Sequence, residues 1–195
     1  MDLSARAVAL ARDAYGLEVE QGNIGDDLWP NLRFDFITLF HVLEHLENPL
    51  AGLHYAAGLL KPQGNLIIQV PNIQSIQAKI FGKRWYGLDV PRHIVNFSPK
   101  ALALMLGRAG FEIQGIARFS LRDNPASIAS SLAPGLDPIG RHGRKRNARP
   151  LTDGLLEFAY LSLFVLSLPF ALFESAFGRG GTIWVHAKKR LGSMG

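Results

Sequence analysis

Hydrophobic positions along this chain switch between two spacings, one typical of helices and one typical of strands. Apolar residues at helical spacing, with capping residues at their ends, predict helices over residues 4–15, 50–60, 73–81 and 98–110. Alternating or short continuous apolar runs predict strands over residues 17–20, 34–40, 64–71, 111–119 and 182–187. Strands that alternate with helices favour an α/β fold with a parallel-dominated sheet.

The last third of the chain does not follow this alternation of strands and helices. Residues 121–150 are rich in Ser, Pro, Gly and Arg, which predicts a mobile, basic insertion. Residues 151–177 are long and apolar enough for a helix before the last strand. Within it, residues 155–173 carry almost no charge. That stretch fits a core or lid helix, an interfacial or re-entrant membrane helix, or a full span, although Pro169 would kink it.

Composition narrows the class of protein. A chain of 195 residues with 48% hydrophobic residues suits one domain with a real core. The absence of cysteine excludes disulfides and thiolate metal sites, and charges near the N-terminus argue against a signal peptide. We therefore expect a cytoplasmic protein, or one that is peripheral on the inner face of a membrane.

Positive charge gathers in one place. The net charge is +5, and five basic residues fall close together: Arg141, Arg144, Lys145, Arg146 and Arg149. Such a run suits phosphate groups, on nucleic acid or on anionic lipid, and it also suits a solvated loop.

Polar chemistry follows the strand at 34–40 directly. His41, Glu44 and His45 come just past its carboxyl end, the edge at which open α/β sheets bind ligands. Their H-x-x-E-H spacing is that of inverted zinc proteases, which requires a helix with both histidines on one face and a third ligand. Because Asn48 and Pro49 limit any continuous helix, we expect no metal. We expect His41 to line a cofactor cleft, with Glu44 and His45 behind it.

Residues 34–46 closely resemble the fourth strand and following acidic turn of class I S-adenosylmethionine-dependent methyltransferases of the type 11/type 23 group. Further segments resemble that family in the same order: residues 2–8, 60–72, 87–93, 97–99 and 109–111. The resemblance implies a Rossmann-like methyltransferase sheet. The family's glycine-rich strand-to-helix turn does not precede Asp2, so we expect an N-terminally truncated domain that lacks the first strand and helix.

The resemblance also assigns residues to the cofactor, S-adenosylmethionine. Asp2 would bind the ribose hydroxyls, although an exposed acid there could simply stabilise the next helix. Asn23 and Ile24 would meet the adenine ring. Asp26 or Asp27 could take part instead, and a plain polar turn is the alternative.

The segment after the fifth family strand would serve the methyl acceptor. His93 is our choice of general base, with a purely structural role as the alternative. Trp85 and Tyr86 would wall the acceptor pocket, and Asp89 and Arg92 would hold His93 or contact substrate.

The expected function is methyl transfer to a small-molecule acceptor, through oxygen, and the apolar C-terminal helix suggests a hydrophobic or lipid-linked acceptor. An anionic membrane surface is an expected partner through residues 141–173. One alternative is a catalytically inactive, truncated remnant that acts as a membrane-associated binding module. The other is an RNA methyltransferase, which only the basic run favours, so we do not expect a nucleic-acid partner.

Overall fold

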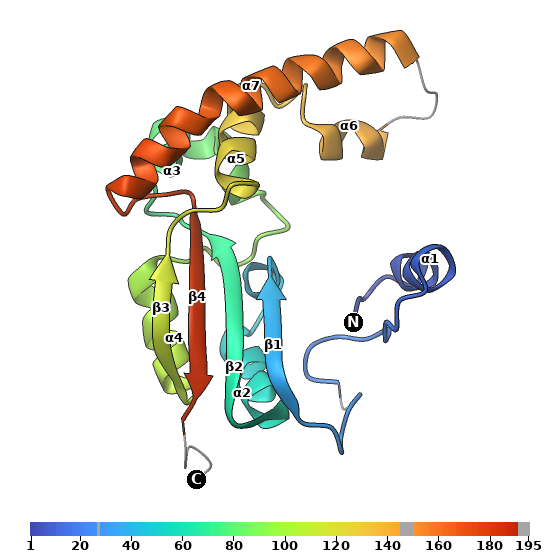
Figure 1. Cartoon of the computed structure of the whole chain (residues 1–195), viewed down its shortest axis with the longest axis vertical. Helices are drawn as coiled ribbons and strands as arrows, with labels where there is room; N and C mark the ends of the chain where they lie inside the picture. Colours follow the sequence, from blue (N-terminus) through green and yellow to red (C-terminus); the bar gives the residue numbers. More distant parts are fainter. Residues whose placement is uncertain (27, 145–149, 191–195) are drawn as a thin grey trace.

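The computed structural model describes residues 1–26, 28–144 and 150–190, and its centre is a four-stranded sheet. The strands lie in the order β1 (Phe34–Phe40), β2 (Leu60–Pro71), β4 (Thr182–Lys189) and β3 (Phe111–Ala117). β1 pairs parallel to β2, whereas β4 is antiparallel to both of its neighbours. β1, β2 and β3 therefore point the same way and only β4 is reversed (Figure 1), as expected for a parallel-dominated sheet.

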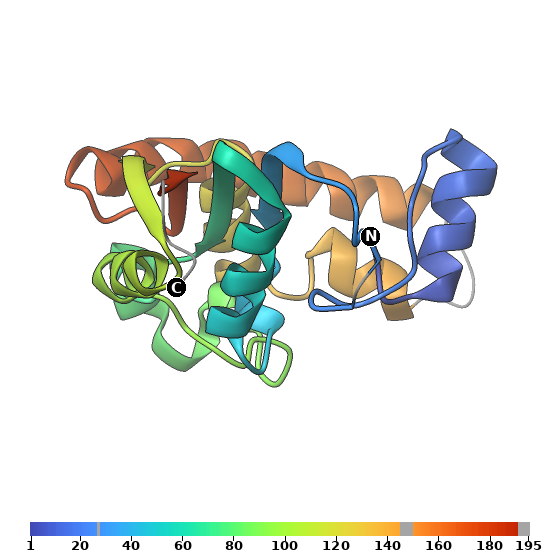
Figure 2. The ribbon, with the colours of Figure 1, turned by 90° about the horizontal axis from the view of Figure 1, so that it is seen from below.

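One face of this sheet forms the core. Helices α2 (Pro49–Leu59) and α4 (Pro99–Arg108) lie together on that side (Figure 2). Their buried leucines, Leu53 and Leu102, pack in one cluster with Ile68 and Val185 of the central strands. Both helices begin as their sequences predict, with an Asn or Ser side chain that caps the helix ahead of a proline in its first turn.

β1 is less buried than its apolar sequence predicts. Leu39 faces the core, but Phe36 is 62% exposed and Phe40 is 46% exposed on the opposite face. In the described part of the chain, β1 pairs with β2 alone and forms the edge of the sheet. The continuous apolar run at residues 34–40 is typical of a buried parallel strand; it does form a parallel strand, but one face of that strand is exposed.

The N-terminal segment stands beside β1 rather than within the sheet (Figure 1). Its helix α1 (Ala5–Tyr15) is capped by Ser4 and ends at Gly16, as predicted. Residues 17–20 form no strand, because alternation needs a pairing partner and only an isolated parallel bridge, Asp2 to Gln21, forms there. The following loop is fastened to α2, since the Tyr55 hydroxyl donates to the Asp26 carbonyl.

Four more α-helices lie in the described residues: α3 (Ile76–Phe81), α5 (Asp123–Leu132), α6 (Pro138–Arg144) and α7 (Pro150–Ala176). α5 and α6 form inside the segment whose composition predicted a mobile insertion. α5 is helical because it packs against α7 and buries Ile128 and Ala129, a contact that composition does not reveal. Lys145, Arg146 and Arg149 of the basic run lie outside the described residues.

α7 is the helix predicted over residues 151–177, and it lies across the end of the sheet above α5 (Figure 1). Ser167, Ala171 and Glu174 are buried, but the large side chains are not: Phe158 is 71% exposed and Leu166 is 75% exposed. A core helix would bury those groups, so the core interpretation is wrong for most of α7. Among the described residues, Thr152–Ala176 is the one stretch of helix long and apolar enough to cross a membrane.

Candidate functional site

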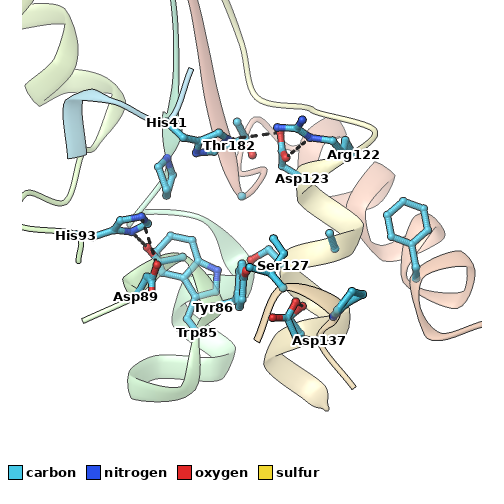
Figure 3. Close-up of a pocket in the computed structure, with 18 of the residues that line it drawn as sticks. His41, Trp85, Tyr86, Asp89, His93, Arg122, Asp123, Ser127, Asp137 and Thr182 are labelled. Carbon is cyan, nitrogen blue, oxygen red and sulfur yellow. Dashed lines mark hydrogen bonds and ion pairs between the residues drawn. The ribbon is translucent and has the colours of Figure 1, made fainter. Parts of the chain in front are cut away.

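A cavity of about 600 Å³ lies at the end of the sheet where β1 and β2 finish. Six residues that the sequence singled out line it together: His41, Trp85, Tyr86, Asp89, Arg92 and His93. Figure 3 labels all of these except Arg92. The opposite wall comes from α5, α6, α7 and the segments beside them: Arg122, Asp123, Ser127, Asp137, Tyr160, Phe164 and Thr182.

Backbone hydrogen bonds bring these segments together. At the end of β1, the His41 N–H donates to the Gln69 carbonyl over 2.9 Å. At the end of β2, the Asn72 N–H donates to the Gly181 carbonyl over 2.8 Å. Since β1 and β2 end at the same edge of the sheet, the loops that follow them meet there, as in other open α/β sheets.

His41 lies between two carboxylates. Its Nδ1 is 3.0 Å from Glu44 Oε1, and its Nε2 is 3.7 Å from Asp123 Oδ2. The carboxylate of Asp123, followed by the hydrogen bond with Glu44, raises the pKa of His41 to about 9 although burial opposes the shift. His41 is therefore a cation at neutral pH and does not accept a proton there.

Asp123 is the partner that holds this charge. Burial works against its ionisation, but the nearby His41 ring and hydrogen bonds from Ser120 and Arg122 keep the pKa of Asp123 below its ordinary value. The Arg122 Nε lies 2.9 Å from the Asp123 carboxylate (Figure 3). The site thus contains a fixed imidazolium and a fixed carboxylate side by side.

His93 is held in one tautomer. Its Nδ1 lies 2.8 Å from the Gly87 carbonyl oxygen, and because a carbonyl only accepts, Nδ1 carries the proton in the neutral ring. Nε2 then keeps its lone pair, 3.9 Å from Asp89 Oδ2. Asp89 itself pairs with Arg92 over 2.6 Å, so Arg92 holds the carboxylate next to His93.

The two aromatic residues have different surroundings. Trp85 is buried, and its indole N–H donates to Gln77 Oε1 over 3.0 Å. Gly87 packs against the Trp85 ring so closely that an added Cβ would lie 2.4 Å from it. Burial, followed by the negative charges of Asp137 and Asp89, raises the pKa of Tyr86 to about 12, so Tyr86 stays neutral.

The three N-terminal site predictions fall elsewhere, because Asp2, Asn23 and Ile24 do not line the cavity. Asp2 Oδ1 accepts the Ser4 N–H over 2.7 Å, which is the helix-stabilising contact that was the alternative for this residue. The Asn23 side chain accepts the Ile24 N–H, and Ile24 packs against the core. The bridge at Gln21 places Asp2 beside this loop. Asp27 lies outside the described residues.

Sequence reasoning missed the wall that α5, α6 and α7 contribute. The charged pair Arg122 and Asp123, five residues past the end of β3, was the available signal, but nothing in its spacing links it to His41. Asp137 accepts from Ser130 over 3.1 Å, and the Tyr160 hydroxyl lies 3.3 Å from the same serine. These contacts exist only after α5 and α7 pack together.

Residues 1–115 match the family model described as "Methyltransferase domain". No curated protein matches the sequence at a significant level.

Several solved structures share the fold. SpnF, a [4+2]-cyclase, is 19% identical, with 96% of this chain and 62% of that one covered and a TM-score of 0.54. An S-adenosylmethionine-dependent methyltransferase of Thermotoga maritima is 16% identical, with 96% and 70% covered and a TM-score of 0.59. Another from Archaeoglobus fulgidus is 17% identical, with 96% and 73% covered and a TM-score of 0.57. The chain therefore spans 62% of the length of SpnF, and at these identities the similarity shows the Rossmann-like fold.

Proposed function

This chain belongs to the methyltransferase-domain family, and on that premise we propose that it transfers a methyl group from S-adenosylmethionine to a small hydroxyl-bearing molecule bound in the cavity. The observation that carries the proposal is the convergence of Trp85, Tyr86, Asp89, Arg92 and His93 on one cavity. Its volume of about 600 Å³ suits a small molecule. A coupled pair of fixed charges, His41 and Asp123, borders the same space.

The residues fit one part of the cofactor. Asp2 uses Oδ1 for its helix, which leaves Oδ2 for a ribose hydroxyl, and the Asn23 loop lies beside it for the adenine. The described residues contain no glycine-rich strand-to-helix turn for the methionine part, so we assign nucleoside contacts only. When bound, S-adenosylmethionine supplies the reactive methyl group, and the protein's task is alignment.

We propose an apolar acceptor, and a lipid-linked one fits best. Tyr160 and Phe164 of α7 line the cavity, whereas Phe158 and Leu161 of the same helix face outward. Apolar surface thus continues from the cavity wall along α7. A long apolar tail could follow α7 while its hydroxyl group reaches the polar end of the cavity at His93.

His93 is the residue that we propose activates the acceptor hydroxyl. Its Nδ1 is committed to the Gly87 carbonyl, and its Nε2 lone pair is therefore held in a fixed direction at the cavity wall. His41 does not suit this role, because its raised pKa keeps it protonated at neutral pH.

Methyl transfer from labelled S-adenosylmethionine to a panel of apolar alcohols and phenols tests the proposal. His93→Ala should lower turnover by roughly a hundredfold or more while calorimetric cofactor binding is unchanged. The matched control is His54→Ala, since His54 is exposed on α2. Equal turnover in both variants would remove His93 from the reaction. Wild-type protein that binds cofactor but methylates nothing in the panel would argue for a binding module.

We also propose that the protein associates peripherally with the surface of an anionic membrane. The exposed apolar side chains of α7 favour this candidate, because burying them in a bilayer interface removes them from water. Arg141 cannot contribute, since it is largely buried and 3.9 Å from Glu157. An RNA acceptor has less support, because it would rest on the same basic run.

A further inference from the structure

We propose that Glu44, His45 and His93 bind one divalent metal ion beside the cavity, whose lining includes His93 but neither of the other two residues. One ligand atom from each residue lies within 4.8 Å of the other two. This set differs from the one that the H-x-x-E-H spacing suggests. Residues Leu43–His45 form a single turn of 3₁₀ helix, and the third member comes from the loop before α4 instead of from His41.

Both histidines are oriented as metal ligands are. His45 Nδ1 lies 2.9 Å from the Arg92 carbonyl oxygen, and His93 Nδ1 lies 2.8 Å from the Gly87 carbonyl oxygen. Each ring donates through Nδ1, so both Nε2 atoms keep their lone pairs. A backbone carbonyl that fixes the tautomer in this way is the usual partner of a metal-binding histidine. The rings lie edge to face with centroids 4.7 Å apart.

Glu44 supplies the independent observation. Its side chain is 1% exposed, and Oε2 is buried without a hydrogen-bond partner among the described residues. Oε1 is already occupied by His41 at 3.0 Å. A buried, unpaired carboxylate oxygen is costly, and a cation next to Oε2 would satisfy it.

The cluster is fixed by its backbone before any ion arrives. The N–H groups of Ile94 and Val95 both donate to the Glu44 carbonyl, over 2.8 and 3.1 Å. The His45 ring adds a third link, to Arg92. Two segments that are distant in sequence are therefore held in a fixed position relative to each other, as a preorganised site requires.

Two imidazole nitrogens and one carboxylate oxygen favour a first-row transition metal such as Zn²⁺, whereas Ca²⁺ and Mg²⁺ prefer oxygen ligands. Three protein ligands leave positions open, which is typical of catalytic sites. The role of the ion rests on the proposed function. With the ion bound, the Nε2 lone pair of His93 would be a metal ligand and not a proton acceptor. An acceptor hydroxyl that reached the ion would then lose its proton to solvent more readily, and His93 would act through the metal.

Metal binding is tested directly on the full chain, first treated with chelator and dialysed. Titration calorimetry with Zn²⁺ should show roughly one ion per chain. His45→Ala, His93→Ala and Glu44→Gln should each weaken binding at least tenfold, whereas His54→Ala should leave it unchanged. His45 is exposed, so His45→Ala keeps the test decisive if the buried Glu44→Gln variant does not fold.

Absence of saturable Zn²⁺ binding by folded wild type would overturn the proposal, as would equal affinity in His45→Ala and His54→Ala. The result is separate from the fate of methyl transfer. Turnover that depends on His93 but persists in chelator would refute the metal-site proposal and leave the methyltransferase proposal standing. Binding of one ion per chain that depends on Glu44, His45 and His93, without methyl transfer, would support the metal-site proposal and refute the methyltransferase proposal.

Discussion

Replacing Phe158 and Leu166 with serine should release the protein from anionic lipid vesicles. Both side chains lie on α7 and point largely into water, with 71% and 75% of their surface exposed. Because most of each side chain is exposed, the double substitution should leave the fold intact. Serine removes the apolar surface without adding a charge that headgroups would repel.

The size of the effect follows from the exposed area. Complete burial of a Phe or Leu side chain stabilises by about 1.5 to 3 kcal/mol. Scaled by the exposed fractions above, each side chain contributes about 1 to 2 kcal/mol when it enters the interface. The pair therefore contributes about 2 to 4 kcal/mol, which corresponds to a partition coefficient roughly 30- to 700-fold lower in the variant.

The assay is co-sedimentation with phosphatidylserine-containing vesicles over a range of lipid concentrations, with circular dichroism as the check on folding. The matched control replaces Leu10 and Leu104, which are 60% and 58% exposed on α1 and α4. That control removes similar apolar surface away from α7 and should still bind. Equal loss in the two double variants would mean that general surface hydrophobicity, and not α7, drives adsorption. No binding by well-folded wild type would refute the membrane proposal.

Three further outcomes concern stability. Glu174→Gln should lower the free energy of unfolding by about 1 to 3 kcal/mol in urea titrations. Both oxygens of this buried carboxylate accept N–H groups, from Gln77 and Gly181, and an amide cannot accept at both positions. The control is Glu18→Gln, which changes an exposed side chain and should have no such effect. The pKa of Asp123 is lowered, so its ionised form stabilises the fold above its ordinary pKa of 3.8, and this contribution is lost as the pH falls through the folded-state pKa. Urea titrations across pH should therefore show the largest deficit of Asp123→Asn near neutrality and a shrinking one below about pH 4. Gly180→Ala should destabilise by about 1 to 3 kcal/mol in thermal melts, since its Cβ would lie 1.7 Å from a carbonyl oxygen, whereas Gly135→Ala meets nothing within 4 Å.

Local chemistry explains which elements the sequence predicts well. Ser98 followed by Pro99 starts α4 because a hydroxyl cap and a fixed φ act within one turn, whatever surrounds them. The same is true of Ser4 and Gly16 at the two ends of α1. The strand predicted over residues 17–20 does not form, because its formation depends on distant residues. Alternation indicates a half-buried surface, but a strand also needs a neighbouring strand to pair with.

The residues of the candidate site also fall into two groups, those that the sequence places together and those that only tertiary packing brings there. Residues 85–93 form one short connecting segment, so a short motif places them together, and six of them line the cavity: Trp85, Tyr86, Gly87, Asp89, Arg92 and His93. Asp123 and Tyr160 belong to helices whose positions depend on α5 packing against α7, and no spacing in the sequence reports that contact. The proposed metal ligands show an intermediate case. Two are adjacent in the sequence, but the third joins them through hydrogen bonds between separate loops.

The same two groups of residues indicate which part of the cavity selects the methyl acceptor. The family match ends at residue 115, but the cavity wall made by α5, α6 and α7 comes from later residues, including Ser127, Asp137 and Phe164. The matched part supplies the sheet edge and the His93 loop. SpnF, a [4+2]-cyclase, shares this fold, so the fold by itself does not fix the reaction. We therefore expect exchanges within α5–α7 to change which acceptor binds, and exchanges at His93 to change whether that acceptor reacts.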